Sequence, residues 1–228
     1  ASMTLTRELK RRGVNVIART AVDRVDTGAN LGATVHYRQG DSDEDRTAYG
    51  EVVLAAIGRV PNTDADWFRS SGLKLDERGY VTVDGYGRTN LDGVWALGDI
   101  TPGHALAHRA FEQGITIAEK IAGADPKPVI DDTVPQVVFS FPEAASVGLT
   151  LDQAKALEDV VEPKETAYPM LSNARMLMSG EGGSMTVVSG AFANNPDMQV
   201  VLGVHIVSPI ASDLIAEAEQ LVGNRVPL

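Results

Sequence analysis

The sequence predicts an α/β chain that leads into an α+β domain with an antiparallel sheet. The first observation is an apolar segment, residues 93–97, which runs through Gly98 and Asp99 into an amphipathic helical stretch. The second is a change of texture at residue 132, after which several strand-like segments follow one another. The third is composition: 43% of the 228 residues are apolar and 22% are charged, which is typical of a packed globular protein.

Composition excludes several function classes. Lys and Arg together number 20, and Asp and Glu 31, so the formal net charge is −11. This balance argues against nucleic acid or an anionic membrane as the main partner, because both require clustered cations. The chain has no cysteine, which excludes a disulfide framework, a Cys-ligated metal site and a thiolate nucleophile within these residues. The longest apolar run, residues 52–57, is too short to cross a membrane and no signal segment precedes it, so we expect a cytoplasmic protein.

The first quarter of the chain is predicted to be a helix followed by strands. Residues 1–13 carry the helix signal, with Ser2 as the N-cap and Gly13 as the stop. The acidic stretch 39–46 is polar throughout and is predicted to be a solvated hairpin tip. Strands are predicted at residues 14–17, 21–25, 33–37 and 51–57.

The middle of the chain is predicted to hold short strands and one long helix. Residues 58–79 are expected to be mainly turns, and residues 81–83 and 93–97 to be strands. The helix is expected from about Ala105 to Ile121, and small or apolar side chains form one stripe along it. The stripe consists of Ala107, Ala110, Phe111, Gly114, Ile115, Ala118 and Ala122.

The last part is predicted to be a sheet with two helices. One helix begins at Thr150, which forms a capping box with Gln153. The other begins at Ser208 and Pro209 and stops at Gly223. Strands are predicted at residues 134–139, 165–171, 184–189 and 199–207.

The strongest chemical signal lies around Asp99. Open α/β sheets bind ligands at the carboxyl ends of their strands, where Asp99 can accept hydrogen bonds from sugar or polyol hydroxyls. Gly98 lets a ligand approach the backbone, and the free amides of residues 105–108 at the helix start suit an electron-rich oxygen. An alternative that stays open is that Asp99 only caps the turn after a core strand. The strand that ends at Gly58 is either a second ligand contact or a plain turn.

Five motifs carry a resemblance to a known family. In this order and spacing, the chain resembles the C-terminal part of the FAD-dependent pyridine nucleotide–disulfide oxidoreductases, most of all their actinobacterial, dihydrolipoamide-oxidising members. The resemblance extends over essentially the whole chain. The motifs are VVLAAIGRVPNT, GYVTVDGYGRTNLDGVWALGDI, ALAHRAFEQG, FSFPEAASVGLT and LGVHIVSPIASDLIAEA.

The resemblance implies two cofactors, FAD and NAD, and a role for each of six residues. Asp99 would hold the ribityl chain of FAD, and Gly58 would lie beside the nicotinamide dinucleotide. The backbone amides of Ala105, Leu106, Ala107 and His108 would face the flavin O2 edge, although Ala105 replaces the family's Met. At His108 the backbone N–H would make this contact, and the imidazole ring is expected to have no chemical role. The four histidines show no metal-ligand spacing, so no metal site is predicted, and His205 between apolar neighbours is expected to pack.

The resemblance also implies a domain order and partners. Residues 1–62 would be the C-terminal part of an NAD-binding domain, and residues 63–131 the second segment of an FAD-binding domain. Residues 132–228 would be an interface domain, truncated at its C-terminal end, that forms a homodimer. Lipoyl-bearing subunits of 2-oxo acid dehydrogenase complexes are candidate partners of the parent protein.

Several parts of the family's machinery are missing from this chain. The cysteine pair and both G-x-G-x-x-G loops of the family lie upstream, and its His-Glu base lies downstream. We therefore expect an incomplete dihydrolipoyl dehydrogenase that contains no catalytic residue and is inactive alone. Two alternatives stay open: an NAD(P)H quinone reductase of the same superfamily, favoured slightly by the stretch Asn173-Ala174-Arg175, and a non-catalytic dimerisation module.

Overall fold

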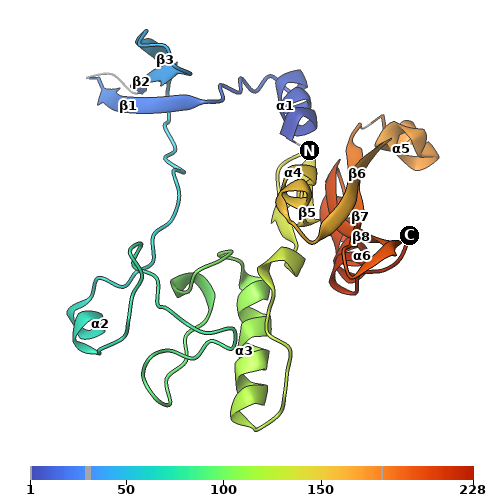
Figure 1. Cartoon of the computed structure of the whole chain (residues 1–228). Helices are drawn as coiled ribbons and strands as arrows, with labels where there is room; N and C mark the ends of the chain where they lie inside the picture. Colours follow the sequence, from blue (N-terminus) through green and yellow to red (C-terminus); the bar gives the residue numbers. More distant parts are fainter. Residues whose placement is uncertain (1, 29–31, 181) are drawn as a thin grey trace. The chain divides into compact units, whose positions relative to one another are not determined.

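The computed structural model describes residues 2–28, 32–180 and 182–228, and the chain divides into two compact units (Figure 1). One unit contains residues up to Glu8 together with Val60–Leu228, and the other contains Leu9–Arg59. Both α and β elements are present, as predicted. No helix in the described ranges is long and apolar enough to cross a membrane.

The unit of residues 9–59 is built on a three-stranded antiparallel sheet in the order β1-β2-β3. The helix α1 precedes it and is followed by Gly13 with φ +84°, which confirms the predicted stop. Ser2 is the first helical residue rather than the cap, and residue 1 of the predicted helix lies outside the described residues. The acidic stretch joins β2 to β3, as predicted. The bounds are α1 Ser2–Arg11, β1 Thr20–Thr27, β2 Ala33–Gln39 and β3 Arg46–Gly50.

Two predicted strands of this unit are wrong. Residues 14–17 and 51–57 form no strand, because neither segment pairs with another strand in the described part of the chain. The apolar side chains of the second segment are instead open to solvent: Val52 is 87% exposed and Ile57 96%.

The stretch from residue 60 to residue 133 packs around a small core of Phe68, Val81 and Ala96. The predicted strands 81–83 and 93–97 are wrong as well, since each forms a single isolated bridge instead of a ladder. The predicted long helix is confirmed, but α3 begins at Ala107, two residues later than expected. The elements here are α2 Asp66–Ser70, η1 Gly98–Ile100, α3 Ala107–Ile121 and η2 Asp131–Thr133.

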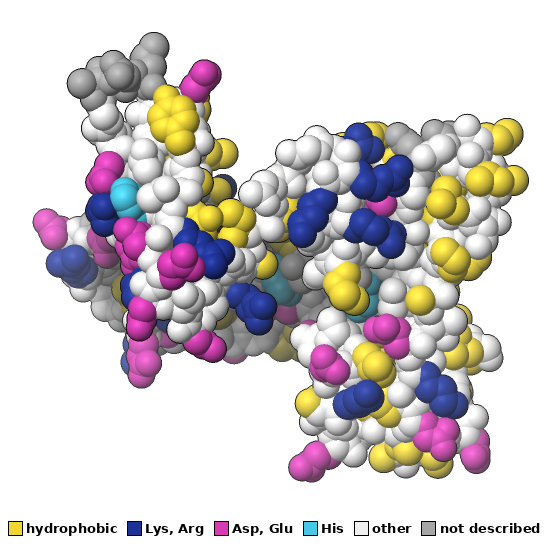
Figure 2. Space-filling view, turned by 90° about the horizontal axis from the view of Figure 1, so that it is seen from above, with side chains coloured by type: hydrophobic (Ala, Val, Ile, Leu, Met, Phe, Trp, Pro, Cys, Tyr) yellow, Lys and Arg dark blue, Asp and Glu magenta, His cyan; other side chains and the backbone are white. Residues whose placement is uncertain are grey.

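The apolar stripe of α3 does not pack as its pattern predicts. Phe111 is 75% exposed and Ile115 54%, whereas the buried residues of the helix are Arg109, Thr116 and Ile117. Within the described residues the stripe is covered only in part: Ala110 and Gly114 are half-buried beside Gly98 and Leu97, whereas its large members Phe111 and Ile115 stay open. Exposed hydrophobic side chains are also visible on the molecular face drawn in Figure 2.

The C-terminal part forms the predicted antiparallel sheet, with five strands in the order β4-β5-β8-β7-β6. The capping box of Thr150 and Gln153 starts α4, as predicted. The last helix begins at Ala211 with Ile210 as its N-cap, three residues after the predicted Ser208. The bounds are β4 Gln136–Val138, β5 Glu143–Gly148, α4 Leu151–Ala156, β6 Val160–Pro169, η3 Met170–Ser172, α5 Ala174–Ser179, β7 Ser184–Phe192, β8 Asn195–Ser208 and α6 Ala211–Gly223.

This sheet is covered on both faces. Helix α6 packs Ile215 against Val147 and Ile206 in one hydrophobic cluster. Helix α4 contributes Ala154 to a second cluster, with Val188 as one of its members. Because neighbouring residues of β8 enter different clusters, residues 200–208 are all buried, as expected of a central strand between two layers.

Candidate functional site

The candidate site is built where η1 meets α3. Gly98 has φ +73°, and a Cβ at this position would lie 3.3 Å from the Cβ of Ala110, so only glycine fits readily against the helix. The backbone N–H of Gly98 donates to Oε1 of Gln113 at 2.8 Å. The hydroxyl of the buried Thr101 donates to the Gly98 carbonyl oxygen at 2.8 Å. These contacts hold the turn that carries Asp99 against α3.

Asp99 presents an unused carboxylate. Its residue is exposed, and within the described residues no hydrogen bond or ion pair engages the carboxylate. The alternative that Asp99 caps the turn is therefore wrong, because the side chain accepts no N–H of that turn. An unpaired carboxylate on a fixed turn can accept hydrogen bonds from the hydroxyls of a ligand.

The start of α3 leaves amide donors free. Leu106 is the N-cap and makes no side-chain cap hydrogen bond. Among the described residues, the N–H groups of Ala105, Ala107 and His108 have no partner, whereas that of Leu106 donates to the His104 carbonyl oxygen at 3.0 Å. Three of the four predicted amides are thus available, and the positive end of the helix dipole favours an electron-rich oxygen there.

The imidazole rings of His108 and His205 are both engaged with backbone carbonyl oxygens. His108 Nε2 donates to Pro135 at 2.8 Å, and His205 Nε2 donates to Leu149 at 3.1 Å. His205 is 9% exposed on β8, which confirms its predicted packing role. No group of three His, Asp or Glu side chains in the described ranges is placed to hold a metal ion.

Gly58 belongs to the unit of residues 9–59 and is therefore described separately from Asp99. Its φ is +121°, a conformation that glycine adopts and other residues avoid. No atom lies within 4 Å of where its Cβ would be, so the backbone here is open to close approach by another group.

One ion pair with displaced pKa values lies in the sheet of this unit, on β1 and β2. The Arg38 guanidinium donates to Asp23 at 2.6 Å, and this hydrogen bond lowers the pKa of the carboxyl group. The same contact raises the pKa of Arg38. Both side chains are solvent-accessible, so the pair is a surface feature.

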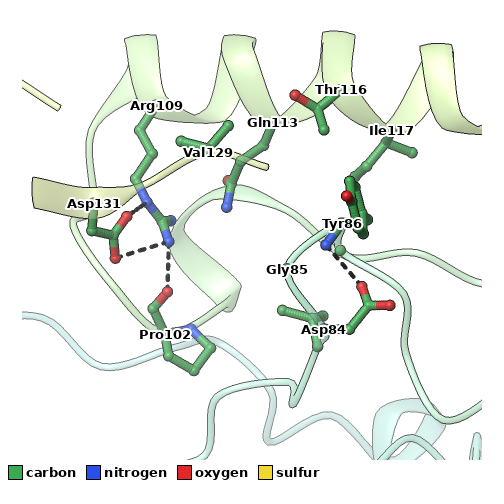
Figure 3. A pocket seen from close by; sticks show the side chains of 12 residues that line it. Asp84, Gly85, Tyr86, Pro102, Arg109, Gln113, Thr116, Ile117, Val129 and Asp131 are labelled. Atoms are coloured by element: carbon green, nitrogen blue, oxygen red, sulfur yellow. Dashed lines mark hydrogen bonds and ion pairs between the residues drawn. The ribbon is translucent and has the colours of Figure 1, made fainter. Parts of the chain in front are cut away.

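Sequence reasoning missed Gln113 and Arg109. Gln113 anchors Gly98, which precedes it by 15 residues, and Arg109 pairs with Asp131, 22 residues further along. No local pattern encodes such contacts. The sequence offered one hint of these contacts. Arg109 and Gln113 are long polar side chains on a helix that was otherwise interpreted from its apolar stripe (Figure 3).

Two family models match the chain in succession. The pyridine nucleotide-disulphide oxidoreductase model matches residues 1–114, and the dimerisation-domain model of the same family matches residues 134–228. The chain belongs to the pyridine nucleotide-disulphide oxidoreductases. This membership confirms the resemblance that the five motifs predicted.

Two relatives within this oxidoreductase family carry the same enzyme name. The chain is 39% identical to a dihydrolipoyl dehydrogenase of Cupriavidus necator, over 93% of this chain and 43% of the relative. It is 37% identical to a dihydrolipoyl dehydrogenase of Geobacillus stearothermophilus, again over 93% and 43%. The chain thus spans less than half the length of these relatives.

Solved structures agree on the fold of the oxidoreductase. The crystal structure of LpdA from Mycobacterium tuberculosis superposes with a TM-score of 0.83 at 31% identity, covering 98% of this chain and 46% of that one. The HOCl-induced flavoprotein disulfide reductase RclA from Escherichia coli superposes with a TM-score of 0.80 at 22% identity, which speaks for the fold alone.

Proposed function

We propose that this chain is the C-terminal portion of an FAD-dependent dihydrolipoyl dehydrogenase, whose whole form oxidises dihydrolipoamide with NAD through FAD and a redox disulfide. The observation that carries the proposal is the succession of both family models along one chain, with relatives of that name at 39% and 37% identity. The chain has no cysteine, so we expect it to perform no thiol–disulfide exchange by itself.

The residues of the candidate site fit a flavin dinucleotide. Asp99 offers a free carboxylate for the hydroxyls of the ribityl chain. The free amides of Ala105, Ala107 and His108 suit the electron-rich O2 edge of the ring. FAD, when bound, supplies the electron transfer between nicotinamide and disulfide, and these residues hold and orient it. Gly58, with its open backbone, is the proposed contact for NAD.

The proposed domain order is residues 1–62 for the NAD domain, 63–131 for the FAD domain and 132–228 for the interface domain. The family match of the last part, together with its sheet β4–β8, supports a homodimer. Lipoyl-bearing subunits of 2-oxo acid dehydrogenase complexes are the proposed partners of the whole protein. A cytoplasmic location is proposed from the sequence.

The stretch Asn173-Ala174-Arg175, which slightly favours the quinone reductase alternative, has a structural role in this chain. Asn173 Oδ1 accepts the N–H groups of Arg175 and Met176, at 3.0 and 3.4 Å, and so caps α5. Helix capping accounts for the Asn without any substrate contact.

The test joins this chain to both the preceding and the following parts of the Cupriavidus necator relative, so that the family's cysteine pair and His-Glu base are present, and compares the product with the 228 residues alone. We expect the joined polypeptide to show a flavin absorption band near ~450 nm and to turn over dihydrolipoamide with NAD. We expect the chain alone to do neither. Asp99→Ala should lower flavin retention in the joined form, whereas Asp92→Ala, a neighbouring exposed carboxylate, should not.

Two outcomes would contradict the proposal, and a third would favour a different one. One is full flavin retention by the Asp99→Ala form, which would remove the assigned role of that carboxylate. The other is a joined polypeptide that binds flavin and reduces quinones but not lipoamide, which would favour the quinone reductase. A stable, colourless dimer in both forms would favour the non-catalytic dimerisation module.

A further inference from the structure

His36 lies at the centre of a polar cluster on the three-stranded sheet β1–β3 (Figure 1). Its side chain is only 13% exposed, although the sheet is small. Histidine is the side chain that ordinarily changes its charge between about pH 5 and 8. The other three histidines, His104, His108 and His205, belong to the other unit. A change of pH through this range therefore acts on residues 9–59 mainly through His36.

Each ring nitrogen of His36 faces a carboxylate. Nδ1 lies 3.4 Å from Oδ2 of Asp45, in the loop that joins β2 to β3. Nε2 lies at ion-pair distance, 3.0 Å, from Oδ2 of Asp26 on β1. A neutral imidazole has one N–H and can donate to only one of these carboxylates, whereas the imidazolium has two and can donate to both. A link from the loop through the ring to β1 therefore requires the second proton.

Arg24 competes with Asp26 for the same ring nitrogen. Its Nη2 lies 3.1 Å from Nε2 and can only donate, so this hydrogen bond requires Nε2 without a proton. The carboxylate of Asp26 can only accept, so its contact requires Nε2 with a proton. The two contacts exclude each other, and the protonation state of Nε2 decides between them. Arg24 keeps a partner in either case, because its Nε donates to Asp26 at 3.2 Å.

The remaining charged groups around the ring come from all three strands and from the loop. They are Asp23 on β1, Arg38 on β2, Asp43 and Glu44 in the loop, and Arg46 on β3. Arg38 donates two hydrogen bonds to Asp23, and Arg46 donates to Glu44. Thr47, which lies opposite His36 on β3, is uncharged. Opposite charges offset each other within these pairs, so the ring's own three partners distinguish its two protonation states.

We propose that His36 is a proton-operated tie between the sheet and the acidic loop of residues 40–45. The neutral ring carries its proton on Nδ1, donates to Asp45 and accepts from Arg24 at Nε2. When Nε2 takes up a proton from water, the Nη2 group of Arg24 leaves the ring and Asp26 becomes the partner. The hydrogen bond to Asp45 then has a charged donor as well as a charged acceptor, which makes it stronger. The loop is therefore held more firmly when His36 is charged than when it is neutral.

The experiment follows the ring and the loop of the 228-residue chain by NMR while the pH is lowered from about 8 to about 5. At the upper pH, the ring nitrogen shifts should show the tautomer that is protonated on Nδ1. As the ring becomes charged, the backbone amides of residues 41–45 should shift with the same midpoint as the ring, and their heteronuclear NOE should rise. A ring protonated on Nε2 at the upper pH, or loop amides that do not follow the ring, would overturn the proposal. This titration requires no variant to fold.

Two histidine variants show whether the response of the loop belongs to His36. His36→Gln keeps a polar side chain but removes the titrating group, so the loop amides should lose their response between about pH 8 and 5. His104→Gln removes a histidine from the other unit and should leave the response intact. A loop that responds in His36→Gln as in the original chain would refute the assignment.

A matched pair of loop variants tests the charge at the end of the tie. Asp45→Asn keeps an oxygen that accepts from Nδ1 but removes the negative charge, so the rise of the loop NOE should be lost. Asp41→Asn, at an exposed position of the same loop, should preserve that rise. An undiminished rise in Asp45→Asn would contradict the proposed link.

Discussion

The strand β8 and the segment 51–57 are both rich in valine and other apolar residues, yet they end in opposite states. Residues 200–208 of β8 are all buried, with α6 packed on one face and the cluster that contains Ala154 of α4 on the other. The segment 51–57 forms no strand, and its side chains are open to solvent. The difference lies in their neighbours: β8 pairs with β5 and β7, whereas nothing in the described chain pairs with residues 51–57. An apolar segment becomes a strand only where a partner strand is present.

The same contrast applies to the helices. Helix α6 buries Ala211, Ile215 and Ala218 against its sheet, whereas α3 leaves Phe111 and Ile115 open. Large exposed apolar side chains on one helical face indicate a surface that another part covers. The relatives are more than twice as long as this chain, and we propose that their preceding part supplies the cover.

The largest difference in stability is expected when one isoleucine in the core of the β4–β8 sheet and one on the open face of α3 are each truncated to alanine. Ile206 is 1% exposed in the core of the sheet, so Ile206→Ala should lower the free energy of unfolding by about 2–5 kcal/mol. Ile115 is 54% exposed, so Ile115→Ala should change it by less than about 0.5 kcal/mol. Urea unfolding followed by circular dichroism measures both. Equal losses would mean that the two regions do not differ in packing as described.

A smaller effect is expected at the cap of α4, the helix that closes one face of the sheet. Thr150→Ala removes the hydroxyl that accepts the Gln153 N–H, and should cost about 1 kcal/mol of stability in the same assay. Lys155→Ala, an exposed change on the same helix, is the control and should be nearly neutral. A neutral Thr150→Ala would show that the sheet holds α4 without its capping box.

The smallest expected effect concerns the exposed pair Asp23–Arg38 in the sheet of residues 9–59. The hydrogen bond from Arg38 lowers the pKa of Asp23 below its ordinary value of 3.8. The pair therefore stabilises the sheet at pH values above the carboxyl group's unfolded pKa, and this stabilisation is lost as the pH falls through the lowered folded pKa. Arg38→Gln should raise the pKa of Asp23 in an NMR titration. A pKa that stays in place would mean that the contact does not persist in solution.

Signals that act over a few residues were predictable. The stop at Gly13, the acidic hairpin tip and the Thr150–Gln153 capping box all depend on neighbouring residues, and all appear in the structure. The predicted strands 51–57 and 93–97 failed because strand formation depends on a distant partner. Conversely β5 was missed, since the weak strand formers of Glu143–Gly148 are held in place by pairing with β4 and β8.

The same difference between local signals and contacts of distant residues applies to the candidate site. Asp99 could be singled out because a Gly-Asp pair after an apolar segment is a local pattern, and so could the helix start at residues 105–108. The sequence did not reveal that the Leu106 N–H donates to the His104 carbonyl oxygen and is therefore unavailable to a ligand. The anchoring of Gly98 by Gln113 joins residues 15 apart, and only the packing of η1 on α3 reveals it.

The most direct test of the account is hydrogen exchange of the chain alone and of the chain joined to the preceding part of the Cupriavidus necator relative. We predict that the amides of residues 52–57 exchange almost without protection in the chain alone. In the joined form they should slow by on the order of a thousandfold, while those of β8 remain equally slow in both. If residues 52–57 stay unprotected in a joined form that is folded, the claim that the preceding part pairs with or covers this segment is contradicted.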